Sequence, residues 1–259
     1  MIESRSLVRI LSVCLLGALL ARPALAQGPH PDHIEVFVTA PDKALEWYTA
    51  HAGGTRTTKD RVAYGDMQLI IHKVAEPKKD GGRTLIDHIA ISAANAEQKV
   101  GELVAAGATR LDRAGDLPVR SIFVKDPWGV TLEVVEDIEP LGFHHIHLRS
   151  SNPAAILKQN QELWHAERAL FKGKVDGLHF NPVWIFVSPE KPSDPPINPA
   201  LDHFALRVVS FDYTFAEVQG KGVKQAAPIM NPPGVKSVYV IGPDTQRIEI
   251  IQRTPVDRK

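Results

Sequence analysis

Four histidines recur along the chain at almost even intervals. They are His33, His88, His145 and His203, separated by 55, 57 and 58 residues. Each lies in a short stretch in which apolar and polar residues alternate, and this period of two predicts a strand. Because every second side chain of a strand faces the same side, each histidine shares a sheet face with the residues two and four positions away.

Two glutamates recur with the histidines. Glu133 follows His88 by 45 residues and Glu249 follows His203 by 46 residues, each in a stretch that predicts a strand. Each half of the chain therefore offers two imidazoles and one carboxylate, a facial triad that holds a divalent ion and leaves coordination positions open. The pattern predicts a metal site but does not identify the ion. The candidates are Zn, Fe(II), Mn, Ni and Co. Ordinary buried or solvated strand residues are the alternative, but they do not explain four histidines in register.

Cationic side chains share these faces in the second half of the chain. Arg149, Arg207 and Arg247 lie on the histidine-bearing faces, together with His147. A cation beside a metal favours an anionic substrate such as a carboxylate through charge-assisted pairing, so we expect these four residues to bind substrate. The alternative is that the arginines are solvated or paired with nearby acids.

The residues that follow each histidine strand predict the same elements four times. We expect helices over Asp42–His51, Ala94–Ala106, Pro153–Glu167 and Phe211–Gly220. Further strands follow each helix, joined by Pro/Gly turns such as Asp126-Pro127-Trp128-Gly129. The chain is thus one strand–helix–strands unit written four times, and we expect consecutive units to pair, with a break near Asp137–Gly142.

The repeated unit resembles a known group of proteins. The Asp-His-Ile starts, Trp47-Tyr48 before Gly53-Gly54, and the stretch from Asp126 to Glu133 (DPWGVTLE) are similar to the vicinal oxygen chelate superfamily. This superfamily includes glyoxalase I, extradiol ring-cleaving dioxygenases, methylmalonyl-CoA epimerase and antibiotic-resistance proteins. The resemblance covers about residues 32–252. It implies an α+β fold of four tandem βαβββ units that form two modules, each with a cupped, mixed eight-stranded sheet and its helices outside. The implied modules are residues 27–139 and 140–259.

The resemblance also implies ligand sets for the metal. The first half offers His33, His88, Glu133 and, at the end of a later strand of the first repeat, His72 as a fourth ligand. The second half offers His145, His203 and Glu249, the three-ligand set of the extradiol dioxygenases, with Val187 at the fourth position. The superfamily also permits ligand sets exchanged between the halves.

Two classes of function follow. The first is a metal enzyme that polarises a carbonyl or hydroxyl of a small oxygenated substrate, with Glu133 or Glu249 moving a proton. Lyase or isomerase chemistry is favoured, and an extradiol-type dioxygenase is the alternative, since Tyr239 lies ten residues before Glu249, where those enzymes place a substrate-binding tyrosine. The second class is a non-catalytic small-molecule binding or resistance protein, which commonly loses the metal positions that this chain keeps.

Composition and the first residues limit the partners and the location. Lys+Arg and Asp+Glu are both 30, so the chain lacks the basic field that holds nucleic acid. Residues 1–26 begin with Arg5 and Arg9, continue with an apolar stretch too short to span a bilayer, and end in Ala24-Leu25-Ala26. This pattern predicts a signal peptide cleaved after Ala26 and a secreted or periplasmic protein, not in the membrane after cleavage, acting as a monomer or homodimer. The only cysteine, Cys14, lies within the signal peptide, so no disulfide or thiolate ligand is expected in the mature chain.

Overall fold

The fold is described from a computed structural model. The structure describes residues 28–76, 85–139, 141–192 and 200–254. The expected signal peptide, residues 1–26, lies outside this part of the chain. Within the described residues, no helix is long and apolar enough to cross a membrane.

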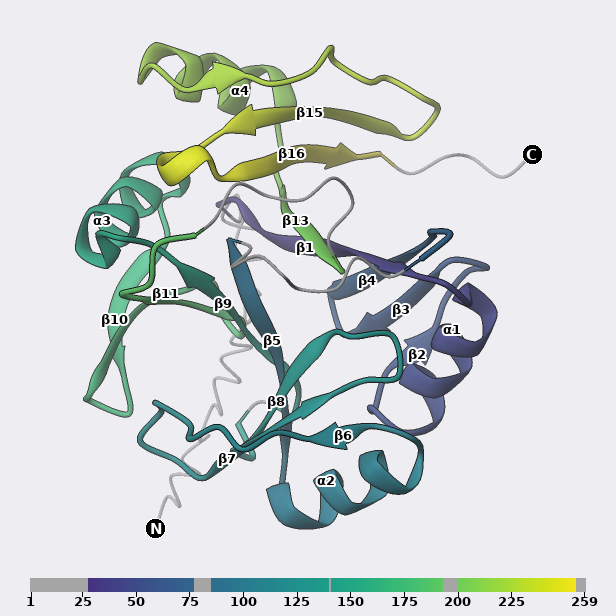
Figure 1. Cartoon of the computed structure of the whole chain (residues 1–259). Coiled ribbons are helices and arrows are strands. Elements are labelled where there is room, and N and C mark those ends of the chain that lie inside the picture. The colour runs from purple at the N-terminus through teal and green to yellow at the C-terminus, as the bar shows by residue number, and fades with distance from the viewer. Residues whose placement is uncertain (1–27, 77–84, 140, 193–199, 255–259) are drawn as a thin grey trace, which may run out of the picture.

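The chain forms the expected βαβββ unit four times (Figure 1). The helices are α1 (Pro41–Ala50), α2 (Ala96–Ala105), α3 (Pro153–Trp164) and α4 (Phe211–Gly220). The strands of the first two units are β1 (His30–Val38), β2 (Thr55–Arg56), β3 (Arg61–Tyr64), β4 (Met67–Lys73), β5 (Ile86–Ala93), β6 (Thr109–Arg110), β7 (Ser121–Lys125) and β8 (Thr131–Glu136). Those of the last two are β9 (Gly142–Arg149), β10 (Glu167–Phe171), β11 (Val175–His179), β12 (Trp184–Ser188), β13 (Leu201–Arg207), β14 (Lys224–Gln225), β15 (Val235–Ile241) and β16 (Arg247–Arg253), with a short turn of 3-10 helix, Pro243–Thr245, between the last two strands.

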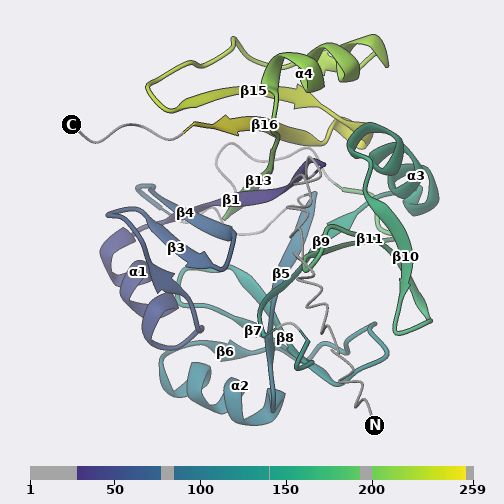
Figure 2. The same ribbon diagram turned by 180° about the vertical axis from the view of Figure 1, so that it is seen from behind.

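These strands form two mixed eight-stranded sheets, as the resemblance implies. The first sheet has the order β14-β15-β16-β13-β1-β4-β3-β2, and the second has the order β10-β11-β12-β9-β5-β8-β7-β6. The four helices lie on the outside of the sheets, seen from both sides in Figures 1 and 2.

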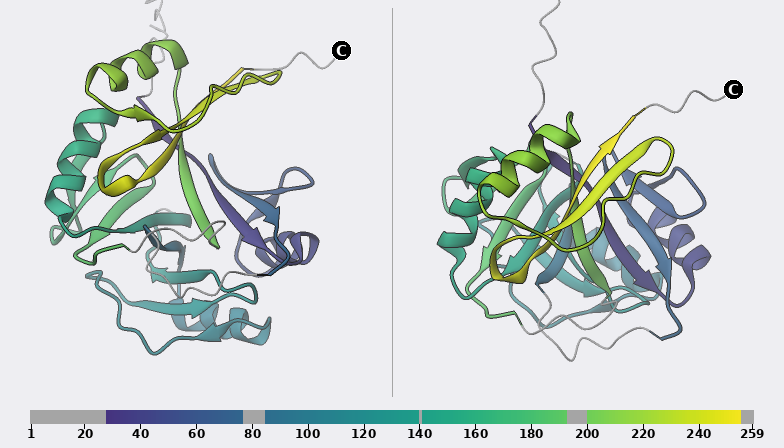
Figure 3. Two further views of the ribbon diagram at one scale, coloured as in Figure 1. Left: turned by 45° about the horizontal axis from the view of Figure 1, so that its top comes forward. Right: turned by 90° about the horizontal axis from the view of Figure 1, so that it is seen from above.

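The pairing of units differs from the expectation. Strand β1 pairs with β13 in an antiparallel ladder, and β5 pairs in the same way with β9. The purple strand β1 therefore lies beside the green strand β13 from the other end of the chain (Figure 3). The first sheet combines units one and four, and the second combines units two and three. The sheets thus do not follow the expected boundaries of 27–139 and 140–259.

Units one and two, and likewise units three and four, meet through contacts of their helices instead of their strands. The Tyr48 hydroxyl of α1 donates to Asp126 of the second unit over 2.7 Å, and Trp47 Nε1 donates to the carbonyl of Ala106 over 2.9 Å. The third and fourth units are joined in a similar way, because Nδ2 of Asn160 in α3 donates to Oε1 of Gln246 over 3.4 Å. These contacts bind the two sheets into one body.

Alternation along the histidine strands sorts their side chains as expected. Ile34, Val36 and Val38 are fully buried in the main hydrophobic core, together with Leu45 and Tyr48 of α1. The opposite face of β1 is left for polar residues, so the helices and the apolar face fix the position of each histidine.

Candidate metal centres

The first sheet brings together one candidate metal centre, which we call the first cluster: His33, His203 and Glu249. Donor atoms of the three side chains lie within 4.8 Å of one another. Glu249 Oε2 lies 3.0 Å from His33 Nε2 and 3.8 Å from His203 Nε2. All three residues are buried. One ligand comes from the first unit and two come from the fourth.

The second sheet contains the second cluster: His88, His145 and Glu133. Glu133 Oε2 lies 3.0 Å from His88 Nε2 and 3.1 Å from His145 Nε2, and the two nitrogens are 3.2 Å apart. Ligands about 2.1 Å from one ion stand about 3.0 to 3.4 Å apart in octahedral or tetrahedral geometry, so these separations fit a single metal ion. The three residues are fully buried.

The ligand sets are therefore exchanged between the halves. The expectation that His33 lies beside His88, and His145 beside His203, is wrong. Strand β1 pairs with β13 and β5 pairs with β9, so His33 lies beside His203 and His88 lies beside His145. The exchanged arrangement, which the resemblance permits, is the one that forms.

A β-bulge accompanies every one of the four histidines. The register slips at Asp32 in β1, at Asp87 in β5 and at His144 in β9, and in β13 both Asp202 and His203 face the single residue Glu35. A bulge interrupts the alternation of side chains and re-aims them. The residue before the histidine can thus turn toward the imidazole instead of pointing to the far face.

Three of these preceding residues are aspartates that hold the imidazole. Each distance joins Nδ1 of the imidazole to a carboxylate oxygen of the aspartate. It is 2.7 Å for His33 and Asp32, 2.9 Å for His88 and Asp87, and 2.7 Å for His203 and Asp202. In the fourth case His144 Nδ1 lies 2.9 Å from His145 Nδ1. A donated Nδ1–H fixes the tautomer and leaves the Nε2 lone pair for a metal. The ligand sets predicted from the sequence do not include these aspartates, although an aspartate directly precedes three of the four histidines.

Charge in the clusters favours ionised carboxylates. Burial opposes ionisation of Glu133, but hydrogen bonds from His145 and His88 hold the pKa of its carboxyl well below the usual range. Burial acts in the same direction on Glu249, yet the neighbouring imidazoles of His203 and His33 lower its pKa to about 2. Both carboxylates are therefore ready to bind a cation at neutral pH.

Unpaired polar atoms also fit a metal. His203 Nε2 and Glu133 Oε1 are buried and have no hydrogen-bond partner among the described residues. A buried polar atom without a partner is costly, and a metal ion satisfies such an atom. The donor set of imidazole and carboxylate suits Zn, Fe, Mn, Ni or Co.

Comparisons with known proteins agree with this fold. The family profile described as "Glyoxalase-like domain" matches residues 33–135. Glyoxalase I from Zea mays superposes with a TM-score of 0.68 at 15% identity, covering 86% of this chain and 92% of that one. A putative dioxygenase from Bacillus subtilis superposes with a TM-score of 0.65 at 15% identity, covering 89% of this chain and 86% of that one. A search of curated proteins finds no match.

The chain has the vicinal oxygen chelate fold. The resemblance drawn from the repeated unit is thereby confirmed.

The fourth position differs between the two sheets of this chain. In the first sheet His72 stands opposite Phe37, and its Nε2 lies 3.3 Å from Glu35 Oε1. The matching residue of the second sheet is Ser188, opposite Arg149, and not the expected Val187. Ser188 Oγ lies 2.7 Å from Nε2 of His147. His72 is thus paired with Glu35, and its role as a metal ligand stays a prediction.

The residues expected to bind substrate surround the clusters. Each of the three arginines contacts an aspartate that precedes a histidine. The ion pairs are Arg149–Asp87, Arg207–Asp32 and Arg247–Asp202. They thus support the imidazoles through the aspartates, which was the stated alternative, and substrate binding by them stays a prediction. His147 packs beside His88, with ring centroids 4.6 Å apart.

An aromatic ring flanks one histidine in each cluster. Tyr239 meets His203 edge to face at 4.9 Å, and Phe123 meets His88 in the same way at 4.9 Å. Only the first cluster therefore has a phenol hydroxyl on its aromatic neighbour.

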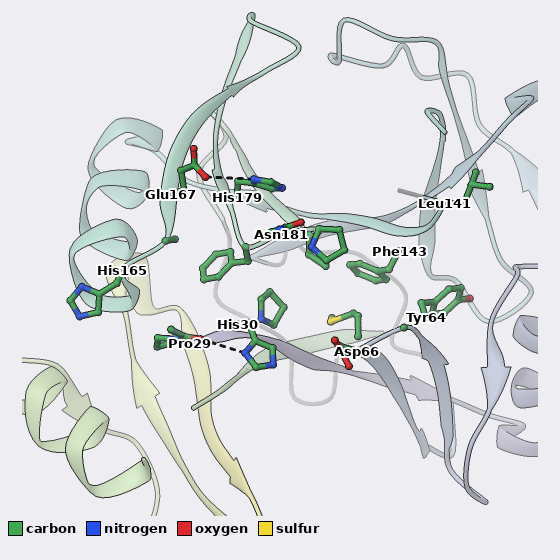
Figure 4. Close-up of a pocket in the computed structure, with 18 residues that line it drawn as sticks. Pro29, His30, Tyr64, Asp66, Leu141, Phe143, His165, Glu167, His179 and Asn181 are labelled. Atoms are coloured by element: carbon green, nitrogen blue, oxygen red, sulfur yellow. Dashed lines mark hydrogen bonds and ion pairs between the residues drawn. The ribbon is translucent and has the colours of Figure 1, made fainter. Parts of the chain in front are cut away.

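A separate cleft lies elsewhere in the molecule. It has a volume of about 540 Å³ and lies between the first and third units, next to His30, Tyr64, Phe143 and His179 (Figure 4). No residue of either cluster lines it. The cleft is therefore distinct from the candidate metal centres.

Proposed function

We propose that this chain is a divalent-metal enzyme that acts on a small oxygenated molecule, with lyase or isomerase chemistry favoured. The observation that carries the metal binding in this proposal is the second cluster. There two imidazole nitrogens and a carboxylate oxygen converge to 3.0–3.2 Å. With Nδ1 of a neutral His88 donating to Asp87, its Nε2 lone pair is aimed at the position between His145 Nε2 and Glu133 Oε2, which a cation would fill.

Each cluster contributes the same parts to this chemistry. His33, His203 and Glu249, or His88, His145 and Glu133, would hold the ion. A bound divalent ion supplies Lewis acidity toward a carbonyl or hydroxyl oxygen. Glu249 or Glu133 would take or return a proton of the substrate.

An acid–base pair that reaches solvent lies beside the first cluster. Glu35 lies 3.7 Å from His203 Nδ1 and 3.3 Å from His72 Nε2, and the His72 side chain is 39% exposed. An acid and a base in contact, one of them reaching water, are suited to pass a proton between the site and solvent.

Hydrogen–deuterium exchange tests the lyase or isomerase reading. The protein is loaded with Zn, Mn, Ni or Co and incubated in D₂O with small hydroxy ketones and hydroxy acids, and exchange beside the carbonyl is followed by NMR. We expect metal-dependent exchange that falls roughly 100-fold or more in Glu249→Gln or Glu133→Gln, whichever cluster is active. Glu46→Gln, on the exposed face of α1, is the control. Absence of exchange with every metal contradicts this chemistry.

Ring cleavage is the second candidate, favoured by the contact of Tyr239 with His203. Oxygen uptake by the Fe(II)-loaded protein with catechols tests it. We expect Tyr239→Phe to slow uptake if this chemistry operates, and no uptake with any catechol excludes it.

We also propose that the protein is exported, on the basis of the pattern in residues 1–26. Amino-terminal sequencing of the protein from its native cells tests this. A mature chain that begins at Gln27 supports export, and a chain that retains Arg5 and Arg9 contradicts it.

A further inference from the structure

The ligands of both clusters are buried, since the side chains of His33, His203 and Glu249 are 2%, 0% and 5% exposed, and the clusters differ in the loops that lie beside them. In the second cluster the side chains of His88, His145 and Glu133 are all 0% exposed. Around the first cluster, side chains that reach solvent stand next to the ligands. Arg247 is 45% exposed and stacks over Tyr239 at 4.0 Å, and His72 is 39% exposed.

The loop between β6 and β7, residues 111–120, closes the second cluster. A Cβ placed on Gly115 would stand 3.4 Å from Glu133 Oε1 and would collide with Ser121, so the backbone here lies directly against the ligand carboxylate. Asp116 lies 3.7 Å from His147 Nε2. The loop is therefore in contact with the ligand glutamate and with the histidine beside the cluster.

The same loop is anchored on both sides of Gly115. Leu117 is 8% exposed and packs in an apolar cluster with Phe171 and Phe186. Arg113 pairs with Asp87 and stacks over Phe123 at 4.2 Å. Removing the loop from the second cluster would therefore require unpacking a leucine and breaking an ion pair.

The corresponding loop of the fourth unit, residues 226–234, behaves differently. It runs back along β15, where the backbone of Met230 exchanges two hydrogen bonds with Ser237 of 2.8 and 2.9 Å. Ile229 and Met230 are 44% and 40% exposed. Its apolar side chains thus face solvent, whereas Leu117 of the β6–β7 loop is buried.

We propose that the two clusters have different roles: the first receives the substrate, and the second holds a metal ion that the β6–β7 loop shuts off from solvent. Closed metal sites are structural, whereas catalytic sites keep an open position. This inference rests on the proposed metal binding.

Zinc release tests the division of roles. Protein loaded with two zinc ions is mixed with an excess of the chromogenic chelator 4-(2-pyridylazo)resorcinol, and release is followed in time. We expect one fast and one slow zinc. His33→Ala should remove the fast phase, and His88→Ala should remove the slow phase.

Leu117→Ala tests whether the β6–β7 loop causes the slow release of zinc, because it changes the loop and no metal ligand. We expect it to accelerate the slow phase roughly tenfold or more and to leave the fast phase unchanged, because the loop loses its buried anchor. Ile229→Ala, on the exposed counterpart loop, is the matched control and should change neither phase. Equal release rates, a slow phase indifferent to Leu117→Ala, or a single bound zinc overturns the inference. Failure to bind any zinc overturns the proposed function as well.

Azide gives a second readout of the open position. In the cobalt-loaded protein, azide should shift the visible spectrum of the His88→Ala variant, in which the first cluster remains. It should leave the His33→Ala spectrum unchanged. The reverse pattern assigns substrate access to the second cluster and overturns the inference.

Discussion

The carboxylate of Asp87 lies 2.9 Å from Nδ1 of His88, although the two residues are neighbours on one strand. A bulge at Asp87 makes this contact possible, and Arg113 and Arg149 bind the same carboxylate from the other side. Each of the other three histidine strands carries a bulge at the same place. The repeated unit thus encodes a ligand together with the means of orienting it.

The first prediction concerns this orienting contact. Asp87→Asn keeps the size of the side chain but removes the charge that holds the imidazole. Loss of such a partner costs about 10- to 100-fold in metal affinity, so zinc affinity of the second cluster should fall by that amount in a competition titration. Asp42→Asn is the control, because the Asp42 side chain is 87% exposed. Unchanged affinity in Asp87→Asn would show that the aspartate does not support the ligand.

The second prediction concerns the exchanged ligand sets. His33 and His203 share one ion, whereas His33 and His88 serve different ions. In zinc titrations the loss of bound zinc in His33→Ala and His203→Ala should therefore not add when the two changes are combined, since either change alone disables the first cluster. His33→Ala and His88→Ala should be additive. Additivity in the first pair together with coupling in the second would restore the pairing of consecutive units.

The third prediction concerns pH and the contact between units. Burial raises the pKa of Asp126 to about 6, despite hydrogen bonds from Tyr48 and from the backbone of Val130 and Trp128. A carboxyl whose pKa is raised on folding stabilises the protein below its unfolded pKa, near 3.8, and loses that contribution as pH rises through 6. Stability should thus fall by roughly 3 kcal/mol between about pH 4 and pH 7 relative to Asp126→Asn.

Denaturant unfolding of both proteins across this range, in EDTA, measures the difference. Asn keeps the acceptor for the backbone amides of Trp128 and Val130 and carries no charge, so its stability should be free of this slope. Parallel pH profiles for the two proteins would contradict the raised pKa.

The sequence predicts the units well and their pairing poorly. Alternation places Ile34, Val36 and Val38 in the core and the histidine on the other face, as observed. All four histidine strands carry the same pattern, however, so nothing local decides whether β1 pairs with β5 or with β13. That choice depends on contacts between distant residues, such as those of Tyr48 with Asp126 and of His33 with Glu249.

The remaining differences have the same kind of cause. A bulge breaks the period of two, so strict alternation assigns Asp32 and Asp87 to the face away from the imidazole. The register of β12 against β9 is set by tertiary pairing, and a shift of one residue replaces Val187 by Ser188. Glu35 was recognised as sharing a face with His33, but its contacts with His72 and His203 depend on two other strands.

Metal content tests the central claim most directly. Elemental mass spectrometry of residues 27–259, after reconstitution with Zn, Mn, Fe(II), Ni or Co in turn, counts the ions bound per chain. We predict two divalent ions in the unaltered protein and one in each of His33→Ala and His88→Ala. A chain that retains no ion with any of the metals would contradict both clusters as metal centres.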